Sequence, residues 1–307
     1  MDPDVAYQIT QLAEDHHSGA TAIATQAAEV FSLAAETSRA PGEAQFLADL
    51  AEVWHVLMAA QPAMAPLFHL ANSVLTAVER APREAKRVSV GAAARGFVAG
   101  LTRRSAKLVD VAQTHFGPEE VVLTISASGT VEAALLKAHG AGLLRRVLCA
   151  ESRPLNEGVE LARRLAEAGV AVTLVADALA PSLVHEATLV LVGADTVSAR
   201  GVVNKAGTYA LALAAEAVAR PFVVLAASDK LLPTRLTDLG ALLGEERDAA
   251  ELLPSPIAGV AVLNRPFDLT PLPLVSSVVM EKGALASNQV GPACDTLPVH
   301  PLLDVHP

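Results

Sequence analysis

The chain of 307 residues has only two cysteines, Cys149 and Cys294, too few for a disulfide framework or a cysteine-rich zinc cluster. Cys149 lies in the apolar run RVLCAE, where we expect a small buried side chain. Aromatic residues make up only 3% of the chain, which argues against a surface that stacks nucleobases.

Basic residues are also scarce, because 23 Lys and Arg face 33 Asp and Glu, for a net charge of −10. Affinity for nucleic acid rests largely on Lys and Arg that neutralise phosphates, so we expect no direct nucleic-acid partner. No apolar run reaches the roughly 18 to 20 residues of a membrane helix. The amino terminus, with Asp2 and Asp4, does not resemble a signal peptide. These features predict a cytoplasmic protein with no membrane partner.

Common cofactor motifs are missing as well. No G-x-G-x-x-G follows the first predicted strand, and the chain has no G-x-x-x-x-G-K-[ST], so neither a dinucleotide nor P-loop chemistry is indicated. Four histidines share no metal-ligand spacing with carboxylates: His16, His17, His55 and His69. The sequence therefore predicts no cofactor and no metal.

The residues that are abundant, Ala, Leu and Val, raise the hydrophobic content to 52%, and the length favours two domains. Residues 1–116 carry apolar positions at three- and four-residue steps, which predicts an all-helical N-terminal domain. The expected breaks between its helices are at prolines: Pro41 with Gly42, Pro62, Pro66 and Pro82.

Residues 117–307 change to short apolar runs with helix-like segments between them at 129–143, 157–168 and 205–219. Continuous apolar runs are typical of strands covered on both faces. The runs are VVLTIS (121–126), RVLCAE (146–151), AVTLVAD (171–177), TLVLVGAD (188–195) and PFVVLAAS (221–228). They predict a Rossmann-like α/β domain with a mostly parallel sheet.

Each predicted strand ends on a polar residue. For any one of them, capping of the next helix is the simpler explanation. Ligands of open parallel sheets bind at the carboxyl ends of the strands, so the whole set favours a binding site there. The set is Ser126 and Ser128, Glu151, Asp177, Asp195 and Ser228.

Three segments stand out along the second half of the chain: ESRPLNEGVELARRL (151–165), GADTVSARGVVNKAGTYALALAA (193–215) and NRPFDLTPLPLVSSVVMEKG (264–283). In this order they resemble the signature segments of one known superfamily. It joins the alpha, beta and delta regulatory subunits of translation initiation factor 2B with methylthioribose-1-phosphate isomerase and ribose-1,5-bisphosphate isomerase. HHSGATAIA and QPAMAPLFHLAN extend the resemblance, more weakly, into the helical half.

The resemblance implies a helical domain before a Rossmann-like domain, a homodimer or higher homo-oligomer, and a sugar-phosphate cleft between the domains. In the isomerases, a Cys after the first strand and the Asp of G-A-D act as the acid and base that move a proton between sugar carbons. The Asp corresponds to Asp195, whereas Ser126 stands at the position of the Cys. A Ser hydroxyl is a far poorer acid or base near neutral pH than a Cys thiol.

Two further departures concern phosphate binding. Where the isomerases have R-G-A, this chain has Ser18, Gly19 and Ala20, and where they have R-P-T it has Gln61, Pro62 and Ala63. In the isomerases these arginines resemble phosphate clamps, a role that suits a planar bidentate donor. Both arginines are missing here, and the residues at those positions, Ser18, Gly19, Ala20 and Gln61, are predicted to contact the ligand.

Other residues of the resembling segments are candidates for ligand contact. Asn204 can hydrogen-bond a hydroxyl, and Lys205 can contact an anion as a point charge or pair with Asp195. Glu151 and Arg153 are secondary candidates, because a structural ion pair would explain them equally well. Ser128 and Lys230 complete the predicted ligand-binding set, and Asp268 is expected to fix the tail near the cleft.

Three functions therefore stay open. We favour an initiation factor 2B-like protein that binds a small phosphorylated metabolite, a sugar phosphate or nucleotide, between its two domains. The first alternative is an aldose–ketose sugar-phosphate isomerase that uses Asp195, with Ser126 or a water replacing the thiol. The second is a dimerisation scaffold without a ligand. Whether the protein is an enzyme stays open.

Overall fold

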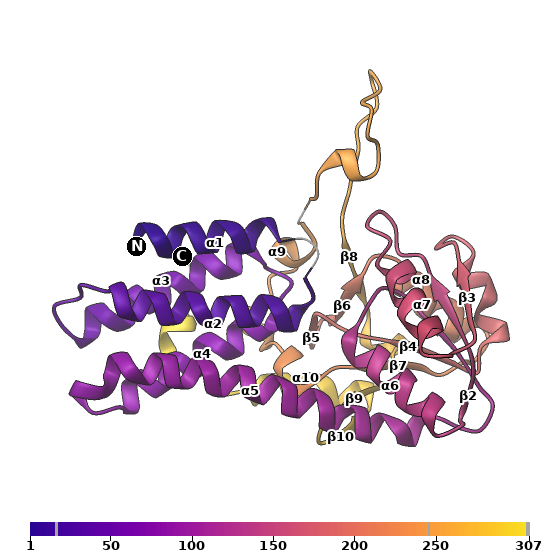
Figure 1. Cartoon of the computed structure of the whole chain (residues 1–307), viewed down its shortest axis with the longest axis horizontal. Coiled ribbons are helices and arrows are strands. Elements are labelled where there is room, and N and C mark those ends of the chain that lie inside the picture. The colour runs from indigo at the N-terminus through magenta and orange to yellow at the C-terminus, as the bar shows by residue number, and fades with distance from the viewer. Residues whose placement is uncertain (16–17, 245, 305–307) are drawn as a thin grey trace. The chain divides into compact units, whose positions relative to one another are not determined.

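The computed structural model describes residues 1–15, 18–244 and 246–304 (Figure 1). It has two compact units, Met1–Arg104 with Asp295–Pro307, and Ser105–Cys294. This division differs from the one predicted at residue 116, because one helix runs through Ala112 and its last turns, with Leu108, join the core of the second unit. The end of the chain joins the helical unit, where the His300 amide donates to Asn72 Oδ1 at 2.7 Å.

Five helices build the first unit: α1 (Pro3–Glu14), α2 (Ala20–Thr37), α3 (Glu43–Ala60), α4 (Ala65–Arg80) and the start of α5 (Lys86–Ala112). The apolar period before residue 37 is divided between α1 and α2, and His16 and His17 lie outside the described residues. Three of the predicted proline breaks fall between helices. Pro66 instead lies in the first turn of α4, where a missing N–H costs nothing.

A seven-stranded sheet forms the centre of the second unit, in the order β10-β9-β7-β4-β1-β2-β3. All neighbours pair in parallel except β10 with β9. The five predicted strands are confirmed as β1 (Glu120–Thr124), β2 (Leu144–Ala150), β3 (Val172–Val175), β4 (Leu189–Val192) and β7 (Phe222–Leu225). Two further strands complete the sheet, β9 (Ser277–Met280) and β10 (Gly283–Leu285).

Helices and a 3-10 segment connect these strands. α6 (Gly129–Gly140) follows β1 and α7 (Glu157–Glu167) follows β2, and both pack against β2. α8 (Thr208–Ala217) packs against the 3-10 segment Ala180–Glu186 and against β4. Two shorter helices, α9 (Leu239–Gly244) and α10 (Ser287–Asp295), lie later in the chain. The predicted Rossmann-like α/β fold is confirmed.

A second, antiparallel sheet was not predicted. It consists of β5 (Thr196–Ser198), β6 (Gly201–Lys205) and β8 (Phe267–Thr270), in that order. The segment predicted as a turn leading into a helix at residue 205 is therefore a hairpin, and α8 begins only at Thr208. Gly201 lets β6 and β8 approach, since a Cβ there would lie 2.5 Å from the Thr270 carbonyl oxygen.

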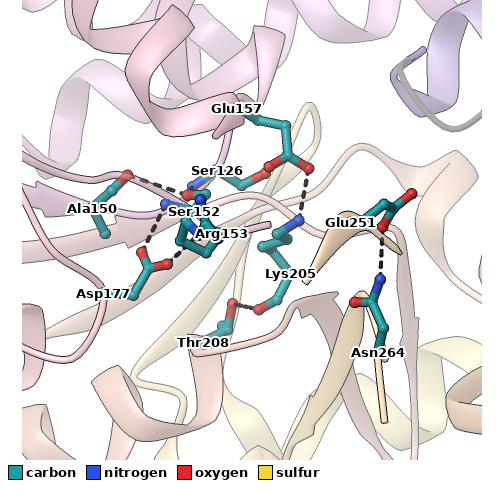
Figure 2. A network of polar contacts seen from close by, with 10 residues as sticks. All are labelled: Ser126, Ala150, Ser152, Arg153, Glu157, Asp177, Lys205, Thr208, Glu251 and Asn264. Carbon is teal, nitrogen blue, oxygen red and sulfur yellow. Dashed lines mark hydrogen bonds and ion pairs between the residues drawn. The ribbon is translucent and has the colours of Figure 1, made fainter. Parts of the chain in front are cut away.

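Between α9 and β8 the chain extends away from both sheets as a long arm (Figure 1). Residues 252–263 of this arm carry no charged side chain and expose Ile257, Val260 and Leu263. Asn264 fastens the root of the arm, because its buried Nδ2 donates to the Asp248 carbonyl at 2.9 Å and to Glu251 Oε2 at 2.7 Å (Figure 2). No helix among the described residues is long and apolar enough to cross a membrane.

Candidate functional site at the carboxyl edge of the parallel sheet

The direction of the strand order changes between β1 and β4, at the centre of the sheet. Chains that leave the carboxyl ends of two such strands turn away from each other, which leaves a crevice where ligands of this fold class bind. Ser128 follows β1, and Gly193 and Asp195 follow β4. The two segments touch, since a Cβ on Gly193 would lie only 2.6 Å from Ser128 Oγ. The site therefore begins at this switch point.

Ser126 leaves β1 in a left-handed backbone conformation, with φ of 66°. Its amide donates to Ser152 Oγ at 2.7 Å, and Ser152 Oγ donates in turn to the Ala150 carbonyl at 3.2 Å (Figure 2). A non-glycine residue is uncommon in this conformation and is kept there by its surroundings. The Ser126 hydroxyl has no hydrogen-bond partner within the described ranges.

Asp177, after β3, anchors the loop that follows β2. Its two carboxylate oxygens accept the amides of Ser152 and Arg153, each at 2.7 Å (Figure 2). Asp177 is thus engaged in holding the loop. Glu151 and Arg153 form no ion pair with each other in the part of the chain that the structure describes, and the Arg153 side chain is exposed.

Lys205 pairs with Glu157 and not with Asp195. Its Nζ lies 2.7 Å from Glu157 Oε1, and the Lys205 side chain is only 5% exposed (Figure 2). Glu157 is the first residue of α7, and its second oxygen, Oε2, is buried without a hydrogen-bond partner in the described structure. An unpaired buried acceptor is costly, so Oε2 is available to a ligand donor.

Glu157 was missed by the sequence analysis. Its partner lies 48 positions further along the chain, and nothing in the local pattern joins them. The one available signal was its position inside the segment 151–165 that resembles the superfamily.

Asp195 is partly buried between β4 and β5, and its carboxylate accepts no hydrogen bond from any described residue. Burial raises the pKa of this carboxyl above its ordinary value, the ammonium groups of Lys230 and Lys205 act in the opposite direction, and the Glu157 carboxylate adds to the rise. A carboxylate that lacks a protein donor but has two ammonium groups near it is suited to bind hydroxyls or to exchange a proton.

Asn204 and Thr208 hold the end of β6 against the start of α8. The buried Asn204 amide donates to Thr208 Oγ1 at 3.0 Å, and Thr208 Oγ1 donates to the Lys205 carbonyl at 2.6 Å. Asn204 pairs in register with Asp268 on β8, so the backbone on either side of Lys205 is held by β8 and by α8.

Asp268 acts as the side-chain cap of α8. It accepts the amide of Gly207 at 2.7 Å and that of Tyr209 at 3.1 Å. Burial raises the pKa of Asp268 to about 6, although these two hydrogen bonds oppose the shift. Asp268 was predicted to fix the tail near the cleft; in the structure it joins β8 to the start of α8.

Lys230 belongs to a 3-10 turn, Ser228–Lys230, after β7. Ser228 is tied to the end of β9, since its amide and hydroxyl donate to the two oxygens of Glu281 at 3.0 and 2.5 Å. Lys230 is partly buried and has no ion-pair partner among the residues described. Its ammonium is therefore the uncommitted cation near Asp195.

The remaining predicted residues lie in the helical unit. Ser18 precedes α2, Gly19 is its N-cap without a side-chain bond, and Ala20 is its buried first residue. Gln61 is buried, and its Nε2 donates to the backbone carbonyls of Leu12 at 2.9 Å and Asp15 at 3.3 Å. The amide of Gln61 therefore ties α1 to the end of α3. No group of three or more metal-ligating side chains occurs among the described residues.

Comparison with known proteins gives consistent matches. The sequence profile of the initiation factor 2 subunit family matches residues 16–287. Ribose 1,5-bisphosphate isomerase of Archaeoglobus fulgidus is 33% identical over 271 residues, which cover 87% of this chain and 85% of that protein. A putative translation initiation factor eIF-2B subunit 2-like protein of Pyrococcus horikoshii is 30% identical, covering 90% and 94%.

The fold comparison agrees. The crystal structure of a Pyrococcus horikoshii translation initiation factor eIF-2B matches with a TM-score of 0.81 at 28% identity, over 94% of this chain and all of that chain. Since the family profile spans most of the sequence and the relatives align over nearly their full length, the chain belongs to the initiation factor 2 subunit family.

Proposed function

We propose that this protein binds a small phosphorylated sugar at the carboxyl edge of its parallel sheet, as an initiation factor 2B-like metabolite-binding protein. The observation that carries the proposal is the Asp195 carboxylate, which accepts no hydrogen bond from the residues that the structure describes and lies near the ammonium groups of Lys230 and Lys205. Such a carboxylate accepts hydrogen bonds from sugar hydroxyls.

The charged side chains of the site assign the phosphate and the hydroxyl groups of the ligand to different residues. Glu157 already neutralises Lys205, so that lysine contributes little net attraction for an anion. Lys230 has no such partner, and we assign the phosphate to it. Asp195 and the free Oε2 of Glu157 then accept hydroxyl groups of the sugar. Asn204, Ser128, Glu151 and Arg153, and in the helical unit Ser18, Gly19, Ala20 and Gln61, stay predicted contacts.

A second candidate function is aldose–ketose isomerisation, and one observation favours it. Burial and the Glu157 carboxylate raise the pKa of Asp195, which brings it closer to the range useful for proton transfer near neutral pH. Asp195 would then carry a proton between neighbouring sugar carbons. Ser126, with its hydroxyl free, would have to hold the substrate oxygen, because a Ser hydroxyl is a weak base. Two of the named relatives above differ on this activity, one being called an isomerase and the other an initiation factor.

The proposal is tested by ligand-induced stabilisation. A ligand that binds only the folded state raises the melting temperature by mass action. The purified protein is melted with ribose 1,5-bisphosphate, methylthioribose 1-phosphate and ribose 5-phosphate, each beside its unphosphorylated sugar. We expect at least one phosphorylated sugar to raise the melting temperature, and Asp195→Asn and Lys230→Gln each to reduce the rise. Arg163→Gln, a change on the exposed face of α7, is the matched control.

The outcomes separate the three functions. A rise without ketose formation supports metabolite binding. Ketose formation that Asp195→Asn abolishes makes the protein an isomerase. If no phosphorylated sugar raises the melting temperature, the proposal is contradicted and the dimerisation scaffold without a ligand is favoured. Light scattering in the same samples measures whether the chain forms the homodimer that we also propose.

A further inference from the structure

An open surface pocket of about 320 Å³ lies at the amino edge of the parallel sheet, opposite the candidate site, where α8 ends and where β7 and β9 begin. α8 stops at Ala217, and Ala219, with φ of 52°, turns the chain into β7. The segment ahead of β9 forms the other wall. Because β7 and β9 are parallel, their amino ends are distant from Asp195 and Lys230, which follow the carboxyl ends.

Two opposite charges line this cavity without pairing. Glu216 and Arg220 are four positions apart, the spacing at which a continuous helix would join them. The left-handed turn at Ala219 interrupts the helix between them, and neither side chain has an ion-pair or hydrogen-bond partner in the described parts of the chain. Arg220 Nε is buried and unsatisfied. A buried N–H without an acceptor is costly, so an acceptor from outside the chain would be stabilised here.

The rest of the lining is mostly apolar. Pro273, Leu274 and Val275 form one wall. Beside them, Ser276 Oγ accepts the Phe222 amide at 3.0 Å, which leaves its hydroxyl hydrogen free to donate. The pocket is open to solvent and lined mostly by exposed residues, and it offers a cation, an anion, a hydroxyl and an aliphatic surface.

We propose that this cavity binds an aliphatic α-amino acid in its zwitterionic form. The carboxylate accepts from Arg220 and Ser276, the ammonium pairs with Glu216, and the side chain packs on Pro273 and Leu274. A phosphate or a simple fatty acid fits less well because Glu216 repels it, and an amine without a carboxylate leaves Arg220 unpaired. The proposal does not depend on the sugar-phosphate site.

The test is isothermal titration of the full chain with four probes: L-leucine, 4-methylpentanoate, 3-methylbutylamine and inorganic phosphate. L-leucine is expected to bind most tightly. Arg220→Gln should weaken its binding about tenfold or more, since a charge-assisted hydrogen bond is lost. Arg163→Gln, which removes an exposed arginine of α7, should leave it unchanged.

Glu216→Gln gives a readout that a merely structural role would not produce. It should weaken binding of L-leucine and strengthen that of 4-methylpentanoate, which lacks the ammonium. Glu216 is exposed, so this variant is expected to fold. It tests the proposal even if Arg220→Gln does not fold. Absence of leucine binding at millimolar concentration, tighter binding of phosphate than of leucine, or equal effects of Glu216→Gln on leucine and 4-methylpentanoate would overturn the proposal.

Discussion

Lys205 Nζ lies 2.7 Å from Glu157 Oε1, and this contact joins the last residue of β6 to the first residue of α7. The lysine side chain is 5% exposed and the glutamate side chain 26%, so the lysine is shielded from water while the glutamate is partly exposed. The charge that the sequence analysis assigned to an anionic ligand is therefore balanced within the protein. Among the described residues, the second oxygen of Glu157 and the carboxylate of Asp195 are acceptors at the site that receive no hydrogen bond.

Glu157→Ala is expected to destabilise the fold by about 3 kcal/mol, because it removes the ion-pair partner of the buried Lys205 ammonium. Lys205→Met in the same chain should restore much of the loss, since the unpaired buried ammonium is then gone. Urea unfolding of the two single variants and the double variant measures this coupling. Strictly additive free energies of unfolding would show that the pair does not couple.

Gly193→Ala should destabilise the protein by about 1 to 3 kcal/mol, because the new Cβ would lie 2.6 Å from Ser128 Oγ and 2.8 Å from Ser128 Cβ. Gly129→Ala is the matched control, since no atom lies within 4 Å of a Cβ built there. Adding Ser128→Gly to Gly193→Ala should recover part of the lost stability. Thermal melts of these variants test the close approach at the switch point, and equal melting temperatures for the two alanine variants would contradict it.

Asp268 makes a specific contribution to the pH dependence of stability. Its pKa rises from 3.8 to about 6 on folding, so between pH 4 and pH 6 the folded chain keeps a proton that the unfolded chain releases. The neutral Asp268 carboxyl therefore contributes about 2 to 3 kcal/mol to the free energy of unfolding below pH 4. This contribution is lost as the pH rises towards 6.

Asp268→Asn removes this titration and keeps a capping side chain. The free energy of unfolding of the variant, relative to the native chain, should therefore rise by that amount between pH 4 and pH 7. Asp4→Asn, at an exposed position of α1, serves as the control. A difference that stays constant with pH would refute the raised pKa.

Both cysteines should resist thiol reagents in the folded protein. Cys149 and Cys294 are fully buried, and burial raises the pKa of Cys149 to about 12, so almost no thiolate forms at pH 8. Mass spectrometry after brief iodoacetamide treatment should detect no label on the native chain and two labels after unfolding in guanidinium. Rapid native labelling at Cys149 would show that the core around β2 opens.

The sequence predicted the parallel sheet because β1, β4 and β7 are fully buried and read as continuous apolar runs. The expected burial on both faces was wrong for β3, whose Thr173 and Leu174 are exposed because it is the last strand at one edge of the sheet. It did not predict the sheet of β5, β6 and β8, since GADTVSARGVVNK carries glycines and charges typical of a loop, and the partner strand lies more than 60 residues away. The carboxylate at Asp195 could be selected from its place after a strand. Lys205 binds Glu157, and Gln61 donates to backbone carbonyls, across long stretches of sequence. A local sequence pattern cannot reveal such contacts.

The most direct test of the central claim is a crystal structure of the protein grown with the phosphorylated sugar that most raises its melting temperature. The account predicts ligand density at the carboxyl edge of the sheet, with sugar hydroxyls within hydrogen-bond distance of Asp195 and the phosphate at Lys230. Density at another surface, with the Asp195 carboxylate left without contact to the ligand, would contradict it.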